Sequence, residues 1–326
     1  MQKVYYYPSA SQQGYENPYS INFKKALSKY YDVCDAKNKP SLMLTLTFLC
    51  NSLLADIFVI NWLESAPFLK LGKIQYLFAC LALTIIKLRK KKIIWILHNI
   101  HPHNGTSKQS EHLQQRLFSQ AVLVVSHSKE AFKWAESKAV GKCLFFPHPV
   151  QDISCTESKS DYPKSDILIW GAVLPYKGIY EFISMKEIQD SDFNILIIGQ
   201  CKNLELEQKI KSCCSNHIHY ENRKAEFSEL SKRIQSSKYV LFPYIGDSVS
   251  SSGALIDTLV LGGNPVGPNK GAFSDLSKTG VCLTYSNKSD LLQILQSDRT
   301  ISKDARISFL KSNSWDSFVG NIISKV

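Results

Sequence analysis

Short apolar runs alternate with amphipathic segments along almost the whole chain. The segments between the runs, such as residues 21–30 and 107–121, place their apolar residues at helical spacing. The runs read KVYYYP, DIFVINW, KIIWILHNI, VLVVSHS and CLFFPHP in the first half, and ILIWGAV, FNILIIG, HIHY, YVLFPY, PVGP and VCLTY in the second. Continuous rather than alternating apolar strands, separated by helices, are typical of a parallel sheet covered on both faces.

The alternation stops once, near the middle of the chain. Residues 150–166 are polar, rich in serine and aspartate, and contain Pro163, which is the composition of a linker. We therefore predict two doubly wound, Rossmann-like α/β domains, residues 1–150 and 166–312, joined by residues 151–165. Ligands of such sheets bind at the carboxyl ends of the strands, so we expect the site in the cleft between the domains.

Two segments are apolar enough to raise the question of a membrane span. Residues 41–60 are interrupted by Asn51 and Asp56 and are predicted to form a helix followed by a strand. Residues 71–92 have an uninterrupted apolar core only over Tyr76–Ile86, short of the roughly 20 residues that a span needs, and end in a basic run. This helix would either lie on an anionic membrane surface or be buried with a solvated, cationic C-terminus.

Composition and charge narrow the class of protein. A hydrophobic content of 44% with 21% charged residues is that of a globular chain. The net charge of +11 is uneven: residues 1–165 carry 21 Lys and Arg against 11 Asp and Glu, and the remainder carries 18 against 17. We expect the basic half to meet nucleic acid, anionic lipid or phosphate; the alternative is that its lysines only maintain solubility. Nine cysteines without C-x-x-C, and no cleavable signal peptide, indicate a reduced, cytoplasmic protein.

Residues 241–273 carry the most informative pattern in the second half. A strand ends at Pro243-Tyr244, a serine-rich loop follows, and a helix begins near Ser252-Gly253. Small residues at a helix N-terminus let backbone N–H groups approach a phosphate, whose negative charge the helix dipole favours. Ser250, Ser251 and Ser252 supply further hydroxyl donors. The alternative for a Ser/Gly N-terminus is ordinary helix capping.

A second element strengthens the interpretation as a phosphate site. The strand ILIW ends at Gly171, and Lys177-Gly178 opens a helix after a short turn. A lysine at that position reaches the same cleft and pairs with a diphosphate as a point charge. The co-occurrence of this lysine with the Ser/Gly loop favours phosphate binding over a solvated surface lysine.

The order of these elements resembles a known group of enzymes. GAVLPYKGI, FPY, SSSGAL, GGNPVG and KGAF resemble the donor domain of GT-B glycosyltransferases, and NPYS, INWLES, LHNIHPHN, SHSKEAF and FPHPV follow in the first half the order of the family-4-type enzymes that build bacterial polysaccharides. The resemblance covers nearly the whole chain. It implies the GT-B fold, two Rossmann-like domains facing across a cleft, with residues 313–326 as a helix that returns to the first domain.

The resemblance also implies a reaction. It is transfer of a sugar from a nucleotide-diphosphate sugar to a lipid-linked or saccharide acceptor in bacterial surface polysaccharide biosynthesis. We favour a UDP-sugar over a GDP-sugar because UDP-sugars are common donors. No cofactor and no metal are expected, since the fold usually works without a metal and no D-x-D pair is evident.

The donor is expected to bind to the second domain. The expected donor-binding residues are Gly171, Lys177, Gly178, Arg223, Tyr244, Ser250, Ser251, Ser252, Gly253, Asp257 and Thr258. Where the family has the acidic pair E-x7-E, this chain has Ser250 and Thr258; we assign the role of the second carboxylate, holding the donor ribose, to the neighbouring Asp257. The arginine that often accompanies the lysine is absent, and Arg223 is expected to replace its charge. These departures leave open which nucleotide sugar is the donor and whether the transfer retains or inverts the configuration at the anomeric centre.

The segment WILHNIHPHNG places His98, His101 and His103 after a strand. We do not predict a metal site, because zinc-binding histidines use i, i+4 spacing or distant strands and this run has no acidic residue before Glu111. His98 and His103 are instead candidate bases for an inverting transfer, and His101 is expected at the loop surface.

Three further residues of the first half are candidates for the acceptor site. Glu64, after INW, is a lesser candidate for the base, and Asn99 and His127, at two strand ends, are expected to bind the acceptor. In a retaining transfer no base is needed, and His98 would bind the sugar.

The basic first domain fits a lipid-pyrophosphate-linked acceptor. We expect a cytoplasmic protein, either free or peripheral on the inner face of the cytoplasmic membrane through residues 71–92. Two alternatives stay open. One is a nucleotide-sugar 2-epimerase on the same fold. The other is a non-catalytic basic protein, which no nucleic-acid-binding motif supports, so nucleic acid is not an expected partner.

Overall fold

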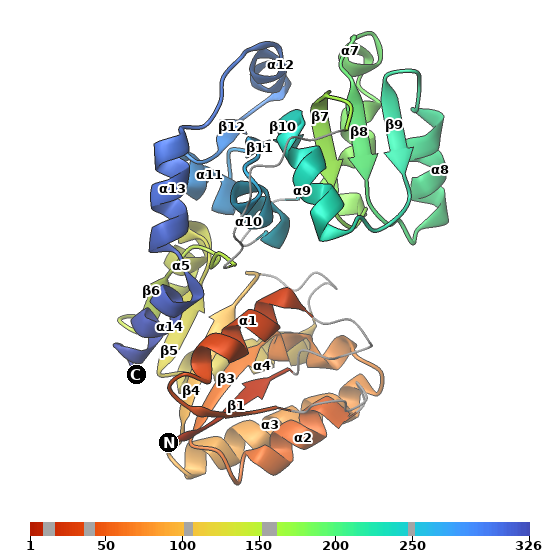
Figure 1. Cartoon of the computed structure of the whole chain (residues 1–326). Helices are drawn as coiled ribbons and strands as arrows, with labels where there is room; N and C mark the ends of the chain where they lie inside the picture. The colour runs from red at the N-terminus through yellow and green to blue at the C-terminus, as the bar shows by residue number, and fades with distance from the viewer. Residues whose placement is uncertain (9–16, 36–42, 101–106, 152–161, 247–251) are drawn as a thin grey trace. The chain divides into compact units, whose positions relative to one another are not determined.

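The computed structural model describes residues 1–8, 17–35, 43–100, 107–151, 162–246 and 252–326. It divides into two compact units (Figure 1). Unit 1 comprises Met1–Pro149 and Asn313–Val326, and unit 2 comprises Val150–Ser312. Most of the expected linker lies outside the described residues, and the first strand of unit 2 begins at Ser165.

Unit 1 is a six-stranded parallel sheet with helices on both faces. Its strands are β1 (Lys3–Tyr7), β2 (Asp32–Cys34), β3 (Ile57–Asn61), β4 (Lys92–Leu97), β5 (Leu123–Ser126) and β6 (Cys143–Phe145). Its helices are α1 (Pro18–Leu27), α2 (Leu44–Asn51), η3 (Leu63–Phe68), α3 (Gly72–Leu88), α4 (Lys108–Gln120), α5 (Lys129–Glu136) and α14 (Trp315–Ile323). The strand order β2-β1-β3-β4-β5-β6 puts the switch point between β1 and β3.

Unit 2 repeats this plan. Its strands are β7 (Ser165–Trp170), β8 (Ile195–Ile198), β9 (Ile218–Glu221), β10 (Ser237–Leu241), β11 (Pro265–Pro268) and β12 (Leu283–Tyr285). Its helices are η4 (Pro175–Lys177), α6 (Ile179–Ile183), α7 (Lys186–Gln189), α8 (Leu204–Ser212), α9 (Phe227–Gln235), α10 (Gly253–Val260), α11 (Gly271–Ser277), α12 (Lys288–Gln296) and α13 (Lys303–Ser312). The order β12-β11-β10-β7-β8-β9, parallel throughout, puts the switch point between β7 and β10.

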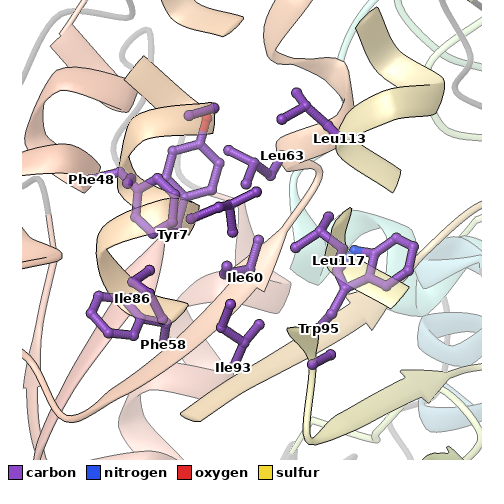
Figure 2. Packing of buried hydrophobic residues seen from close by; sticks show 14 of the residues in the cluster. Tyr7, Phe48, Phe58, Ile60, Leu63, Ile86, Ile93, Trp95, Leu113 and Leu117 are labelled. Carbon is purple, nitrogen blue, oxygen red and sulfur yellow. The ribbon is translucent and has the colours of Figure 1, made fainter. Parts of the chain in front are cut away.

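The two faces of the unit 1 sheet belong to separate cores. Figure 2 shows the first, in which Tyr7, Phe58 and Trp95 of the strands pack against side chains of α2, α3 and α4. On the other face Tyr6 and neighbouring strand residues pack against α1 and against Phe318 of α14. Because alternate residues of a strand point to opposite faces, a sheet covered twice needs continuous apolar strands. That requirement is why the apolar runs of the sequence could be recognised as strands.

The predicted fold class is confirmed: both sheets are parallel, doubly wound α/β sheets, and every apolar run listed above contributes a strand. The C-terminal helix α14 belongs to unit 1, as the resemblance implied, with Trp315, Phe318, Val319 and Ile322 buried. Strand β2 was not predicted, since it is a three-residue edge strand that begins with the exposed Asp32. No helix in the described part of the chain is both long and apolar enough to cross a membrane.

Candidate functional site

In unit 2 the switch point gathers residues from two distant segments. Strands β7 and β10 are neighbours, but the chain leaves β7 towards β8 and leaves β10 towards β11. Gly171 directly follows β7, and Tyr244 lies three residues beyond the end of β10. The carboxyl ends of parallel strands lie at one edge of the sheet, so this edge is where a doubly wound fold binds ligands.

Lys177, at the end of η4, is a buried cation at this edge. Its side chain is 8% exposed, and among the described residues it forms no ion pair. The ammonium Nζ lies 5.7 Å from the centroid of the Tyr244 ring, on whose face a cation is attracted. Burial lowers the pKa of Lys177 to about 8. A buried charge without a partner is costly, which makes this position a ready partner for an anion.

The backbone around Lys177 is held by close packing. Gly178 has φ 63°, and a Cβ there would lie 2.2 Å from the carbonyl oxygen of Pro243. A hydrogen bond from the Ile245 N–H to the Tyr176 carbonyl, 3.0 Å, joins the same two segments. At Gly171, which has φ 100°, a Cβ would lie 3.3 Å from Nζ of Lys177. The predicted Gly171, Lys177 and Gly178 therefore form one compact corner with the segment after β10.

Tyr244 connects this corner to the N-terminus of α10. Burial raises the pKa of its hydroxyl, and the nearby side chain of Ser252, the N-cap residue, lowers it in part. The Ser252 hydroxyl accepts from the Leu255 N–H at 3.3 Å. Gly253 is exposed, and a Cβ there would meet nothing within 4 Å. The structure thus brings Lys177, Tyr244, Ser252 and Gly253 together. Ser250 and Ser251 lie outside the described residues.

The two positions considered for the ribose differ in their surroundings. The Thr258 hydroxyl is buried, donates to the Ala254 carbonyl at 2.8 Å and accepts from the Trp170 indole at 3.0 Å. It therefore ties α10 to the end of β7. Asp257 is half-buried, its carboxylate forms no hydrogen bond or ion pair with a described residue, and burial raises the pKa of this carboxylate to about 7. The carboxylate of Asp257 is therefore available to a ligand, whereas the hydroxyl of Thr258 is already bonded to Ala254 and Trp170.

Arg223 lies away from this corner. It follows edge strand β9, with β8 between β9 and β7. Its guanidinium pairs with Glu221 and with Glu229, the shortest N–O distance being 2.5 Å in each case, and Arg233 contacts the same two carboxylates. The carboxylates already neutralise the charge that Arg223 was expected to offer a donor.

In unit 1, His98 follows β4 and is buried at the carboxyl edge of the sheet. Its Nε2 lies 2.9 Å from Oδ1 of Asn61, whose amide donates to the Tyr7 carbonyl at 3.0 Å. Because Asn61 presents its oxygen, Nε2 of His98 carries the proton, and Nδ1, which has no partner among the described residues, keeps its lone pair. The ring stacks on Trp62 at a centroid distance of 4.1 Å. Burial holds the pKa of His98 well below its usual range.

Beside His98 the structure gathers two more histidines around Tyr19. His127 donates from Nδ1 to the Phe146 carbonyl at 2.8 Å, so its Nε2 accepts from the Tyr19 hydroxyl, also at 2.8 Å. Both its ring nitrogens are used, and burial lowers its pKa to about 3. His148 lies with its ring centroid 5.2 Å from that of Tyr19, and burial lowers its pKa to about 4. His127 therefore positions Tyr19 and has no ring nitrogen left for an acceptor.

Glu64 is not part of this cluster. It is 2% exposed, lies near Trp95 and Tyr7 of the other core, and has its pKa raised to about 7 by burial. Its Oε2 and the Trp95 Nε1 are buried and without partners among the described residues. Glu64 therefore lies with the core on one face of the sheet and apart from the histidines around Tyr19.

The remaining predicted residues can be placed only in part. His101 and His103 lie outside the described residues, and Asn99 is half-buried beyond the end of β4. Within the described ranges, no three His, Cys, Asp or Glu side chains are placed to hold a metal ion.

Comparison with solved structures identifies the fold. HepE of Anabaena, solved with UDP and glucose, superposes with a TM-score of 0.72 at 14% identity and full coverage of both chains. Sucrose-phosphate synthase of Thermosynechococcus elongatus has a TM-score of 0.66 at 11% identity, covering 100% of this chain and 99% of its own. A TarM variant of S. aureus, solved with UDP and other ligands, has a TM-score of 0.61 at 15% identity over 87% of this chain and 58% of its own. The chain has the GT-B fold. No family model and no curated protein matches the sequence.

On this GT-B framework, sequence reasoning missed residues that surround His98. Tyr19, Asn61, Trp62 and Trp315 pack around or bond to the histidines, although NPYS and INWLES had drawn attention to the first three as motifs. Their positions at a helix start and a strand end carried a signal. Their partners are 35 or more positions away in the sequence, and only the fold brings them together.

Substituting Gly178 should destabilise unit 2. In Gly178→Ala the new Cβ meets the Pro243 carbonyl in a left-handed backbone conformation, so we expect a loss of about 2 kcal/mol or more in unfolding free energy. The matched control Gly253→Ala, in open space, should stay within about 0.5 kcal/mol of the parent. Urea unfolding followed by circular dichroism measures both, and equal stability of the two variants would contradict the packing described.

The buried histidines should make unit 1 acid-sensitive. A histidine whose pKa is lowered by folding binds protons better when unfolded, so its contribution is full above the unfolded pKa of about 6.5 and is lost as pH falls towards the folded value. For His127 that window runs down to a pKa of about 3. His127→Gln should reduce the dependence of unfolding free energy on pH by about 1.4 kcal/mol per pH unit between pH 6 and 4.5.

Four of the five tryptophans belong to unit 1, so tryptophan fluorescence during urea unfolding reports on it. The exposed His219→Gln variant is the control and should keep the slope of the parent. An unchanged slope in His127→Gln would contradict a buried, neutral imidazole.

Proposed function

We propose that this chain is a glycosyltransferase that moves a sugar from a nucleotide-diphosphate sugar, a UDP-sugar before a GDP-sugar, to an acceptor hydroxyl. The observation that carries the proposal is the buried Lys177, which forms no ion pair with a described residue and lies over the ring of Tyr244, near the N-cap residue Ser252 of α10. Both features attract an anion, and they meet at the switch point of a doubly wound sheet. HepE, which shares the fold, was solved with UDP and with UDP-glucose, and this supports the choice of donor.

The donor chemistry follows from these charges. When the glycosidic bond to the diphosphate breaks, negative charge develops on the leaving phosphate oxygens. The Lys177 ammonium and the backbone amides at the start of α10 stabilise that charge without having to reorganise. With a pKa of about 8, Lys177 is mostly protonated at pH 7, and a bound diphosphate would raise this pKa further. These groups supply the positive charge, so the proposed transfer needs no metal ion.

His98 is the residue proposed to act on the acceptor. Its depressed pKa keeps the ring neutral at pH 7, and Asn61 fixes the tautomer that leaves Nδ1 as an acceptor. In an inverting transfer Nδ1 would take the proton of the acceptor hydroxyl. In a retaining transfer it would accept a hydrogen bond from a sugar hydroxyl instead.

The proposed acceptor is a lipid-linked or other saccharide in bacterial surface polysaccharide biosynthesis, used at the cytoplasmic side of the membrane. The excess of 21 basic over 11 acidic residues in positions 1–165 supports an acceptor that carries a pyrophosphate.

Nucleotide binding tests the donor site directly. UDP should raise the melting temperature by several degrees at a concentration about 100 times its dissociation constant, because it binds only the folded state. Lys177→Met should remove most of this shift and lower kcat about a hundredfold or more, whereas Lys202→Met, at an exposed position of the same unit, should change neither.

The screen should include GDP, ADP and CMP with their sugars, and an incubation with UDP-sugar alone. A chain stabilised by none of these nucleotides would rule out the proposed function. Epimerisation of the donor without an acceptor would replace it with the epimerase alternative.

The role of His98 is tested by kinetics. His98→Ala should lower kcat about a hundredfold or more, and His112→Ala, at an exposed position of α4, should leave it unchanged. In His98→Gln the amide oxygen can accept a hydrogen bond but cannot take a proton. Activity higher than that of His98→Ala would show that His98 binds the sugar, and activity as low as that of His98→Ala would show that His98 is the base. Full activity of His98→Ala would remove His98 from the site.

A further inference from the structure

Helix α3 has an apolar face that stays exposed. Ile74, Leu77, Leu81 and Leu88 are 47%, 54%, 45% and 76% exposed, and their spacing places them along one line of the helix. The opposite face holds the side chains that α3 buries against unit 1, namely Gln75, Ala79, Ala82, Leu83 and Ile86. We call Ile74, Leu77, Leu81 and Leu88 the α3 stripe. Several adjacent exposed apolar side chains indicate an interaction surface.

The apolar surface continues beyond the C-terminal end of the helix. Arg89, the C-cap residue, donates to the carbonyl of Ser52 at 2.6 Å, which holds the turn after α2 beside the end of α3. That turn carries Leu53 and Leu54, which are 58% and 62% exposed. An exposed leucine pair therefore lies next to the end of the stripe at which Leu88 stands.

Unpaired lysines lie at both ends of the stripe. Lys70 and Lys73 are exposed at the start of α3, and Lys87 and Lys90 are exposed at its end. None of the four forms an ion pair with a described residue. Two other lysines of the basic run are engaged: Lys91 pairs with Asp56 at 2.7 Å, and Lys92 donates to the Val326 carbonyl at 2.6 Å.

The charges around the α3 stripe indicate what kind of surface binds it. Residues 65–110 contain no Asp or Glu, and nearby Asp56 is already paired with Lys91, so lysines dominate the charge along the stripe. A second copy docking through the same stripe would bring like charges together, which is unfavourable. An apolar line bordered by lysines complements a surface with anionic groups outside and hydrocarbon beneath. A 17-residue helix is too short to cross a bilayer and long enough to lie on one.

We propose that α3 docks unit 1 on an anionic phospholipid bilayer, with the helix axis parallel to the membrane plane, the stripe among the acyl chains and the four lysines at the headgroups. The inference deepens the proposed function, because a lipid-linked acceptor would be presented at such a surface. Vesicle binding requires neither donor nor acceptor, so it fails or holds independently of the transferase activity.

Sedimentation with vesicles tests the docking. The parent should bind vesicles containing phosphatidylglycerol at low salt, bind phosphatidylcholine vesicles at least tenfold more weakly, and lose most binding in about 0.5 M salt. Leu77→Glu/Leu81→Glu should weaken binding about tenfold or more, and so should Lys73→Gln/Lys87→Gln/Lys90→Gln. The matched controls are Leu204→Glu, 75% exposed in unit 2, and Lys202→Gln/Lys278→Gln/Lys311→Gln, and both should bind like the parent.

A second measurement does not depend on loss of function. In Leu81→Trp the new indole should be quenched by bromine-labelled lipid beyond the level of the parent, and in Leu204→Trp it should not. The UDP-induced melting shift of Leu77→Glu/Leu81→Glu should equal that of the parent, which shows that unit 2 is intact. Equal binding of parent and stripe variant overturns the proposal. The proposal is also overturned if the parent does not bind vesicles and is instead a dimer in analytical ultracentrifugation that the stripe substitutions dissociate.

Discussion

Burial of both faces of two parallel sheets is the constraint on which the rest of this structure depends. The middle of every interior strand must be apolar on both faces, so polar side chains that act on a ligand are confined to the ends of strands. In unit 2 this confinement puts Gly171 and Tyr244 at one edge, and in unit 1 it puts Asn61, His98 and His127 at another. The chemistry of each unit is thereby concentrated at the carboxyl edge of its sheet.

Polar side chains are buried at the carboxyl edges of both sheets, but their charge states differ. At the edge of unit 1 the histidines stay neutral because burial depresses their pKa values. Tyr19 and the Phe146 carbonyl bond to both nitrogens of His127, and Asn61 bonds to Nε2 of His98. At the edge of unit 2 a lysine is buried without a counter-charge in the described residues, and its pKa falls only to about 8. A hydrogen-bonded network holds a side chain in one orientation, and a buried cation without a counter-charge favours the binding of an anion. The proposed acceptor and donor roles rest on this difference.

The α3 stripe breaks the rule that exposed helix faces are polar. The helix buries one side against unit 1 through small and aliphatic residues, and leaves leucine and isoleucine on the other. A face of this kind lowers the solubility of a free protein, and the surrounding lysines compensate for this in water. The apolar stripe and the lysines around it are both favourable only at a surface that is anionic outside and apolar beneath. Helix α3 therefore accounts for part of the uneven charge of the chain.

Local patterns in the sequence predicted the strands, most helices, the doubly wound class and the helix that begins at Gly253, because periodicity and capping are properties of neighbouring residues. Those patterns could not show that Glu221 and Glu229 neutralise Arg223, that the Thr258 hydroxyl is used by Trp170, or that Glu64 lies in the opposite core from His98. They also drew attention to His101 and His103, although His98 is surrounded by Tyr19, His127 and His148 from other segments. The partner that neutralises, buries or orients a side chain comes from distant parts of the chain, so the sequence determined which groups are present and only the tertiary structure decided which of them remain unpaired.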